Sequence, residues 1–129
     1  MKGREMSEIR VLVVDDEETF LMGIRRILDG PELIVETAEN FNDAIALINE
    51  QDFNFVITDL RLTDAINTEG LDILKHIRQR RPGTKVIILT GYGNTGTMEK
   101  AYSMGASLYL EKPVSGNLLR SILVNSGGP

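Results

Sequence analysis

The chain has 129 residues, the usual length of one domain, and contains no cysteine and a single histidine, His76. These counts exclude a disulfide framework, a thiolate metal site and a histidine metal cluster, so any bound metal must rest on oxygen ligands. The 19 acidic and 14 basic residues give a net charge of -5, which argues against binding of the phosphate backbone of nucleic acid.

The sequence carries no sign of a membrane or secretory segment. No apolar run approaches the roughly 20 residues that span a bilayer, and residues 1–8 lack the apolar core of a secretory signal. We therefore expect a cytoplasmic chain without membrane contact. With no internal repeat, one domain is expected over residues 9–125, between a flexible N-terminus at 1–8 and a tail or linker remnant at 126–129.

Short apolar runs alternate with helical patterns along the chain. Strands are predicted at residues 10–14, 33–37, 53–58, 85–90 and 107–110, each rich in Val, Ile or Leu. Because these strands are apolar on both faces and are separated by helices, they require a parallel sheet covered on both sides. The pattern therefore predicts five β/α units in one doubly wound α/β domain.

The helices between the strands are marked by caps and by apolar spacing. Asn40 and Ser115 are predicted to cap the second and fifth helices, Pro82-Gly83 to stop the third, and Gly105 to close the fourth. The predicted core-facing residues recur at three and four positions: Phe20, Ile24, Ile27 and Leu28; Ala44, Ile45 and Ile48; Leu71, Leu74 and Ile77; Met98, Ala101 and Tyr102; Leu118, Leu119 and Ile122.

Polar residues stand where four of the five strands end, and ligands bind beyond the carboxyl ends of strands in such sheets. The first strand ends in Asp15-Asp16, the third in Asp59, the fourth in Thr90, and the fifth runs into Lys112. A single Asp after a strand is usually a helix cap or a turn former. Three acids, a hydroxyl and an ammonium at one sheet edge indicate a binding site. Because the crowded carboxylates repel one another, we expect a cation to bind there.

Four segments, VLVVDDEE, VITDL, VIILTGYG and LYLEKPV, occur in this order and resemble the receiver domain of two-component response regulators over nearly the whole chain. The segments GYG and GASLYLEKP are most similar to receivers that precede transcriptional activator modules. The resemblance implies a flavodoxin-like (βα)5 fold with strand order 2-1-3-4-5.

The resemblance also implies a role for each acid. Asp59 would be the phosphoacceptor, and Asp15, Asp16, Asp59 and the backbone carbonyl of Arg61 would hold Mg²⁺. The chemistry agrees, since an ionised Asp needs no general base but must approach an anionic phosphoryl group beside two more carboxylates. Two like charges ~4 Å apart at an effective dielectric of ~20 cost on the order of 4 kcal/mol, which a divalent cation offsets.

The remaining residues of the resemblance form a switch. Lys112 would contact the phosphoryl group, and the Lys112–Pro113 peptide would be cis. Thr90 would donate its hydroxyl to the phosphoryl group, and Tyr109 would then swing from solvent into the vacated space. This would reshape the surface made by the fourth helix, the fifth strand and the fifth helix.

The resemblance implies partners as well. A sensor histidine kinase or a phosphotransfer protein would supply the phosphoryl group. An output domain or partner protein, controlling transcription, would read the reshaped surface, and a phosphorylation-dependent homodimer is a further expectation. The chain would catalyse only its own phosphorylation and dephosphorylation, and so would not be an enzyme with a free substrate.

The segment TDLRLTDAINTEGLDIL departs from the receiver pattern. No proline follows the acceptor within a few residues, and Gly70 comes about three residues late. The loop after Asp59 is therefore longer and more polar, and its acids Asp64 and Glu69 are expected to affect kinase recognition and the lifetime of the phosphoryl group.

Two other classes of protein fit part of the pattern. Haloacid dehalogenase-like phosphatases also begin with a strand ending in Asp, but their second carboxylate is normally Asp, whereas Glu17 stands here, and their cap domain needs more chain. A degenerate receiver used only for protein binding would not need Asp59, Thr90 and Lys112 together.

Overall fold

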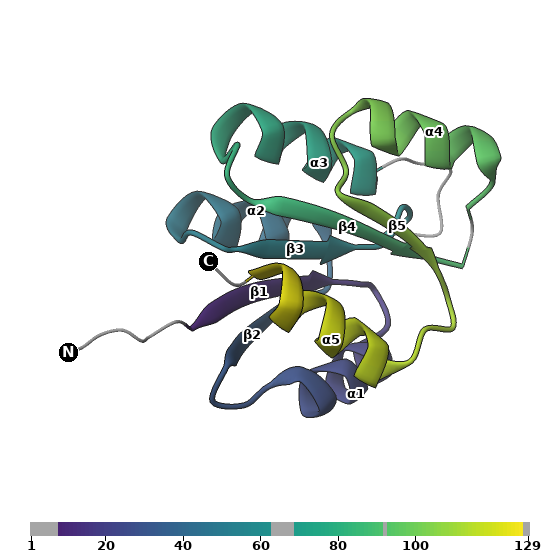
Figure 1. Cartoon of the computed structure of the whole chain (residues 1–129). Coiled ribbons are helices and arrows are strands. Elements are labelled where there is room, and N and C mark those ends of the chain that lie inside the picture. The colour runs from purple at the N-terminus through teal and green to yellow at the C-terminus, as the bar shows by residue number, and fades with distance from the viewer. Residues whose placement is uncertain (1–7, 63–68, 92, 128–129) are drawn as a thin grey trace.

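The computed structural model describes residues 8–62, 69–91 and 93–127 and contains five parallel strands and five helices in alternation (Figure 1). The strands are β1 (Ile9–Val14), β2 (Leu33–Ala38), β3 (Phe55–Thr58), β4 (Lys85–Thr90) and β5 (Leu108–Glu111). The helices are α1 (Glu18–Leu28), α2 (Phe41–Glu50), α3 (Glu69–Arg80), α4 (Thr95–Ser103) and α5 (Gly116–Gly127). The sheet order β2-β1-β3-β4-β5 confirms the predicted doubly wound, flavodoxin-like fold.

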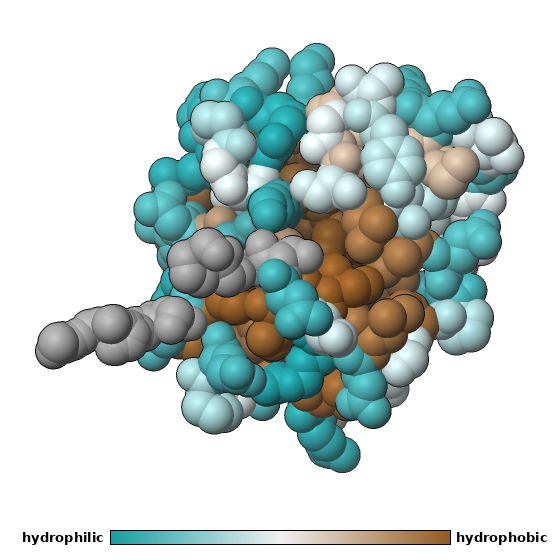
Figure 2. Space-filling model, in the orientation of Figure 1, coloured by the Kyte–Doolittle hydropathy of each residue, from teal (hydrophilic) through white to brown (hydrophobic). Residues whose placement is uncertain are grey.

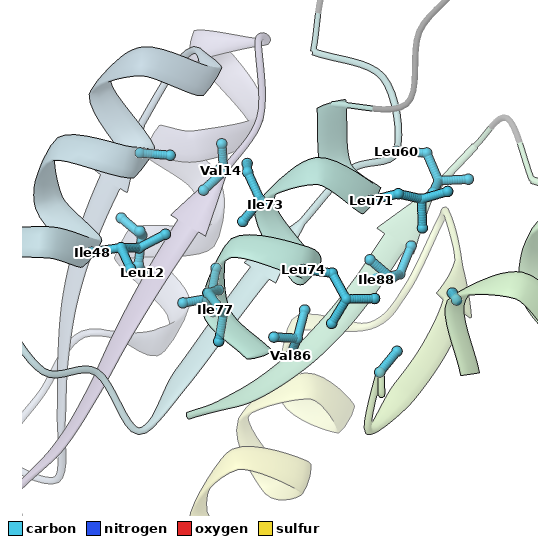
Figure 3. Packing of buried hydrophobic residues seen from close by; sticks show 14 of the residues in the cluster. Leu12, Val14, Ile48, Leu60, Leu71, Ile73, Leu74, Ile77, Val86 and Ile88 are labelled. Atoms are coloured by element: carbon cyan, nitrogen blue, oxygen red, sulfur yellow. The ribbon is translucent and has the colours of Figure 1, made fainter. Parts of the chain in front are cut away.

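Successive residues of each strand face opposite sides of the sheet, and both sides are apolar. In β1, Leu12 and Val14 pack toward α2, α3 and α4, whereas Val11 and Val13 pack toward α1 and α5. Figure 3 shows the first of these two cores, in which α3 lies against the centre of the sheet. Because both cores share the same strands, the sheet is the rigid frame that holds the strand ends in place.

The predicted helix caps are present. The side chain of Asn40 accepts a hydrogen bond from the Asp43 N–H at 2.8 Å, and Ser115 Oγ accepts one from the Leu118 N–H at 3.2 Å. Gly105 follows α4 with a φ of 105°. The structure adds one cap that the sequence analysis did not predict, a reciprocal capping box at the start of α4 between Asn94 and Thr97.

Three residues predicted to face the core are exposed instead. Ile27 is 45% exposed, Tyr102 is 43% exposed and Leu118 is 52% exposed, so these predictions were wrong. Helix α1 buries Leu21, Ile24 and Leu28, and α5 buries Leu119 and Leu123. In α1 and in α5, the apolar spacing alone allowed either of two faces to be the buried one. Packing against the sheet and between α1 and α5 selected one of them.

The element bounds differ slightly from the predicted ones. Strand β3 begins two residues later than predicted, β5 is shifted by one residue, and α5 runs to Gly127, into the predicted tail. The predicted flexibility of the N-terminus and the role of Asp64 concern residues 1–7 and 63–68, which lie outside the described ranges. Within those ranges, no helix is both long and apolar enough to cross a membrane.

Apolar side chains remain at the surface over β4, β5 and α5 (Figure 2). They line a shallow hollow of about 430 Å³ formed by Phe55, Lys85, Ile87, Ser107, Leu108 and Ile122. This hollow faces away from the carboxyl ends of the strands, because it includes the first residues of β3, β4 and β5.

Candidate functional site

Three strand ends meet at one ammonium group. Lys112 Nζ, just after β5, lies 2.5 Å from Asp15 Oδ2 and 3.1 Å from Asp59 Oδ2. Asp15 follows β1 and Asp59 follows β3, and their side chains are only 2% and 3% exposed. Parallel strands bring their carboxyl ends to the same sheet edge, so residues up to 97 positions apart share one site.

The orientation of Asp59 is fixed by its own backbone. Asp59 Oδ1 accepts a hydrogen bond from the Leu60 N–H at 2.6 Å and a longer one from the Arg61 N–H at 3.4 Å. With Oδ1 engaged by amides, Oδ2 is the oxygen that faces Lys112. Helix α3 supports this turn closely, since a Cβ on Gly70 would overlap the Asp59 carbonyl oxygen and the Gly70 N–H donates to Leu60 O at 3.0 Å.

Asp15 is held in a similar way. Its backbone N–H donates to the carbonyl of Ala38 on β2 at 3.1 Å, and its Oδ1 accepts a hydrogen bond from the Glu17 N–H at 2.9 Å. Asp15 therefore offers Oδ2 to Lys112 while Oδ1 orders the turn into α1.

Asp16 differs from the other two acids because its side chain is exposed. Partial burial and the negative charges of Asp15 and, to a smaller extent, Asp59 raise the pKa of the Asp16 carboxyl above its ordinary value of 3.8. Among the residues the structure describes, no three acidic or histidine side chains converge into a cluster that could hold a metal ion. Lys112 joins Asp15 to Asp59, and Asp16 lies close enough to both for their charges to raise its pKa.

Lys112 itself remains protonated. Burial alone would lower the pKa of its ammonium, but hydrogen bonds and charges from Asp15 and Asp59 together outweigh burial and raise it. The Lys112–Pro113 peptide is cis in the structure, the isomer that the resemblance implies. A further neighbour of this group, which no sequence motif indicated, is Phe20, whose ring centroid lies 4.4 Å from Lys112 Nζ.

Thr90 and Tyr109 lie side by side near the site. Thr90 is fully buried at the end of β4, and Tyr109 on β5 is only 9% exposed. The Tyr109 hydroxyl lies 3.1 Å from Thr97 Oγ1, a contact that no sequence pattern indicated. The Tyr109 N–H donates to the Tyr102 hydroxyl at 3.0 Å. The expectation that Tyr109 starts in solvent is therefore wrong for this structure, in which the ring is already packed inward.

The family model of the response regulator receiver domain matches residues 11–124. The chain belongs to this family. The receiver domain accounts for nearly all of the sequence and for every strand-end residue described above. The match gives no support to a phosphatase or to a module of another family.

Curated relatives of this receiver domain include bacterial regulatory proteins. The photosynthetic apparatus regulatory protein RegA of Cereibacter sphaeroides is 33% identical over 117 residues, which are 91% of this chain and 62% of RegA. The acid tolerance regulatory protein ActR of Rhizobium meliloti is 36% identical over 118 residues, 92% of this chain and 59% of ActR. The chain thus spans about three fifths of the length of these relatives.

Solved structures agree with the fold. A CheY-like response regulator receiver domain from Methanospirillum hungatei matches with a TM-score of 0.85 and 29% identity, covering 94% of both chains. A response regulator from Burkholderia pseudomallei, solved with a phosphorylated aspartic acid, calcium ion and citrate, matches with a TM-score of 0.81 and 28% identity over 93% of this chain and 69% of that chain.

Replacing Asp16 by asparagine should stabilise the receiver domain near neutral pH in the presence of a chelator. Because its pKa is raised, the folded state binds the Asp16 proton more tightly than the unfolded state, so ionisation of Asp16 costs stability above its folded pKa. The asparagine removes this cost, and its advantage should vanish below pH 3.8, where the carboxyl is protonated in both states. Urea midpoints across this pH range measure the difference.

Glu18→Gln, in the exposed first turn of α1, is the control for this experiment. It should gain no stability, because a carboxylate is favourable at a helix N-terminus. Equal midpoints for wild type and Asp16→Asn near neutral pH would contradict the repulsion described here.

Gly93→Ala should displace the ring of Tyr109. A Cβ on Gly93 would overlap the Tyr109 hydroxyl and lie 3.1 Å from the methyl group of Thr90, so the ring must leave its place beside Thr97. Nuclear Overhauser contacts between Tyr109 and Thr97 should be lost. Gly91→Ala is the matched control in the same loop, since a Cβ there meets no atom within 4 Å. Retained contacts in Gly93→Ala would show that this packing is wrong.

Proposed function

We propose that the receiver domain accepts a phosphoryl group on Asp59 in a reaction that depends on Mg²⁺. The observation that carries the proposal is the pair of buried carboxylates, Asp15 and Asp59, that share one ammonium at the carboxyl edge of the sheet. Burying two carboxylates lowers the stability of the fold. Their placement is therefore better explained by a function than by stability.

The donor set of the site suits Mg²⁺. This cation prefers hard oxygen ligands, binds through one or two carboxylates and keeps several waters, so it does not need a cluster of three acids. Asp15, Asp16, Asp59 and the carbonyl of Arg61 would hold it, and the pKa of Asp16, raised by partial burial and by the charges of Asp15 and Asp59, reflects a site that a cation would relieve. When bound, the cation neutralises charge on the acceptor and on the incoming phosphoryl oxygens.

The chain's own residues then perform the transfer. Asp59 Oδ2 attacks the phosphorus in line with the leaving group of the donor, the new O–P bond forms as the donor's bond to phosphorus breaks, and no proton has to be removed from the carboxylate. The amide hydrogen bonds to Oδ1 keep the carboxylate oriented. Lys112 moves its hydrogen bonds from the carboxylates to the phosphoryl oxygens, where negative charge collects.

The phosphorylated state changes the surface around Tyr109. A phosphoryl group brings strong acceptor oxygens, and Thr90 donates its hydroxyl to one of them. Because the Thr90 methyl and the Tyr109 hydroxyl pack around Gly93, movement of Thr90 changes the packing of Tyr109. Tyr109 also lines a hollow of about 500 Å³ between α4 and β5, with Met98 and Glu111 among its other walls.

A partner that binds the face formed by α4, β5 and α5 would read this change. The donor would be a sensor histidine kinase or a phosphotransfer protein, and the reader an output domain, a partner protein or a second receiver domain in a phosphorylation-dependent dimer. The relatives RegA and ActR are named as regulatory proteins, which supports transcription as the output. Catalysis is limited to the chain's own phosphorylation and dephosphorylation, and the cytoplasmic location stays a prediction.

Asp59→Asn should abolish phosphorylation while leaving the fold intact. The amide cannot attack phosphorus, although it fills the same space and can still accept from the Leu60 N–H. Incorporation of labelled phosphate from acetyl phosphate, with Mg²⁺ and with a chelator, measures the reaction. Asp72→Asn, exposed on α3, is the matched control and should label like wild type. Wild-type labelling of Asp59→Asn, or labelling that is unchanged by the chelator, would overturn the proposal.

A further inference from the structure

Phe20 lies against the ammonium of Lys112. Its ring centroid is 4.4 Å from Lys112 Nζ, within the range of about 6 Å over which a cation is attracted to the face of an aromatic ring. The same ammonium binds Asp15 and Asp59. We propose that Phe20 is a positioning residue that holds Lys112 in place before and after phosphoryl transfer. The role of Phe20 in phosphoryl transfer rests on the proposed function, whereas the contact between Phe20 and Lys112 does not.

The ring is itself well anchored. Phe20 lies in the first turn of α1 and is half-buried against the core that α1 and α5 form with the sheet. The side chain of Lys112 is 19% exposed, with carboxylates and the Phe20 ring among its contacts. A rigid helix therefore places an aromatic surface beside a residue whose long stem is otherwise flexible.

The kind of attraction matters for the reaction. Lys112 must exchange carboxylate oxygens for phosphoryl oxygens, so its hydrogen bonds cannot hold it in one place throughout. The face of a ring attracts the charge of the ammonium without using one of its three N–H donors. Contact with Phe20 can persist while the hydrogen-bond partners of Lys112 change. This contact limits the number of conformations that the Lys112 side chain samples during transfer.

Substitutions at position 20 can tell whether the Phe20 side chain only fills space or also positions Lys112 through its aromatic face. Leucine at position 20 would keep an apolar side chain against the core but lose the aromatic face, whereas tyrosine would keep the face. Phe20→Leu and Phe20→Tyr therefore separate the two roles. Met22→Leu, at an exposed position of the same helix, is the matched control.

The first measurement is the chemical shift of the Lys112 ε-methylene protons in the unphosphorylated protein. The ring should shift these protons upfield in wild type, Phe20→Tyr and Met22→Leu, and the shift should disappear in Phe20→Leu. An unchanged shift in Phe20→Leu overturns the inference and leaves the proposed function standing.

The second measurement is the affinity for beryllofluoride, a phosphoryl mimic, in the presence of Mg²⁺. Phe20→Leu should bind roughly threefold to tenfold more weakly than wild type, the range expected for a partly buried cation–π contact, and Phe20→Tyr should bind like wild type. Equal affinity of Phe20→Leu and wild type, or equal weakening by both substitutions, overturns the positioning role. A wild-type protein that does not bind beryllofluoride overturns the proposed function instead, while the Lys112 shift still reports on the contact.

Discussion

The ammonium of Lys112 between Asp15 and Asp59 is the interaction on which the site depends. Two carboxylates that are almost fully buried would repel each other and lose their hydration, and Lys112 supplies the charge that makes their position tolerable. The same pair keeps Lys112 protonated despite its own burial. One ammonium thus faces both carboxylates before a phosphoryl group arrives.

The sheet makes this arrangement possible. Strands β1, β3 and β5 are parallel, so their carboxyl ends lie at one edge of the sheet. Helices cover both faces, and the polar groups of the site therefore lie at the carboxyl ends of these strands. The same frame places the proposed switch residues next to each other. Thr90 ends β4, and Tyr109 lies on the neighbouring strand beside α4, so in the proposed mechanism a displacement of the Thr90 hydroxyl would reach α4 through the packing of Tyr109 against Thr97.

The sequence predicted the parts of this molecule that local chemistry determines. A few neighbouring residues are enough to predict the apolar strands that end in Asp15, Asp59 and Thr90 and a helix cap such as Asn40. The fold follows from the alternation of strands and helices along the chain. The rotation of a helix does not depend on neighbours alone, which is why Ile27 was placed in the core although it is exposed. Contacts between distant elements were equally hidden: nothing near Phe20 indicates that Lys112 will lie over its ring.

The direct test of this account is the affinity for Mg²⁺ when Lys112 is replaced by methionine, which keeps an apolar stem of similar length. If the ammonium occupies the space between Asp15 and Asp59, it competes with the divalent cation, and Lys112→Met should bind Mg²⁺ several times more tightly than wild type in a calorimetric titration. Lys85→Met, an exposed lysine at the opposite end of the sheet, makes the same change in net charge and should have little effect. Unchanged or weaker Mg²⁺ binding by Lys112→Met would contradict the account.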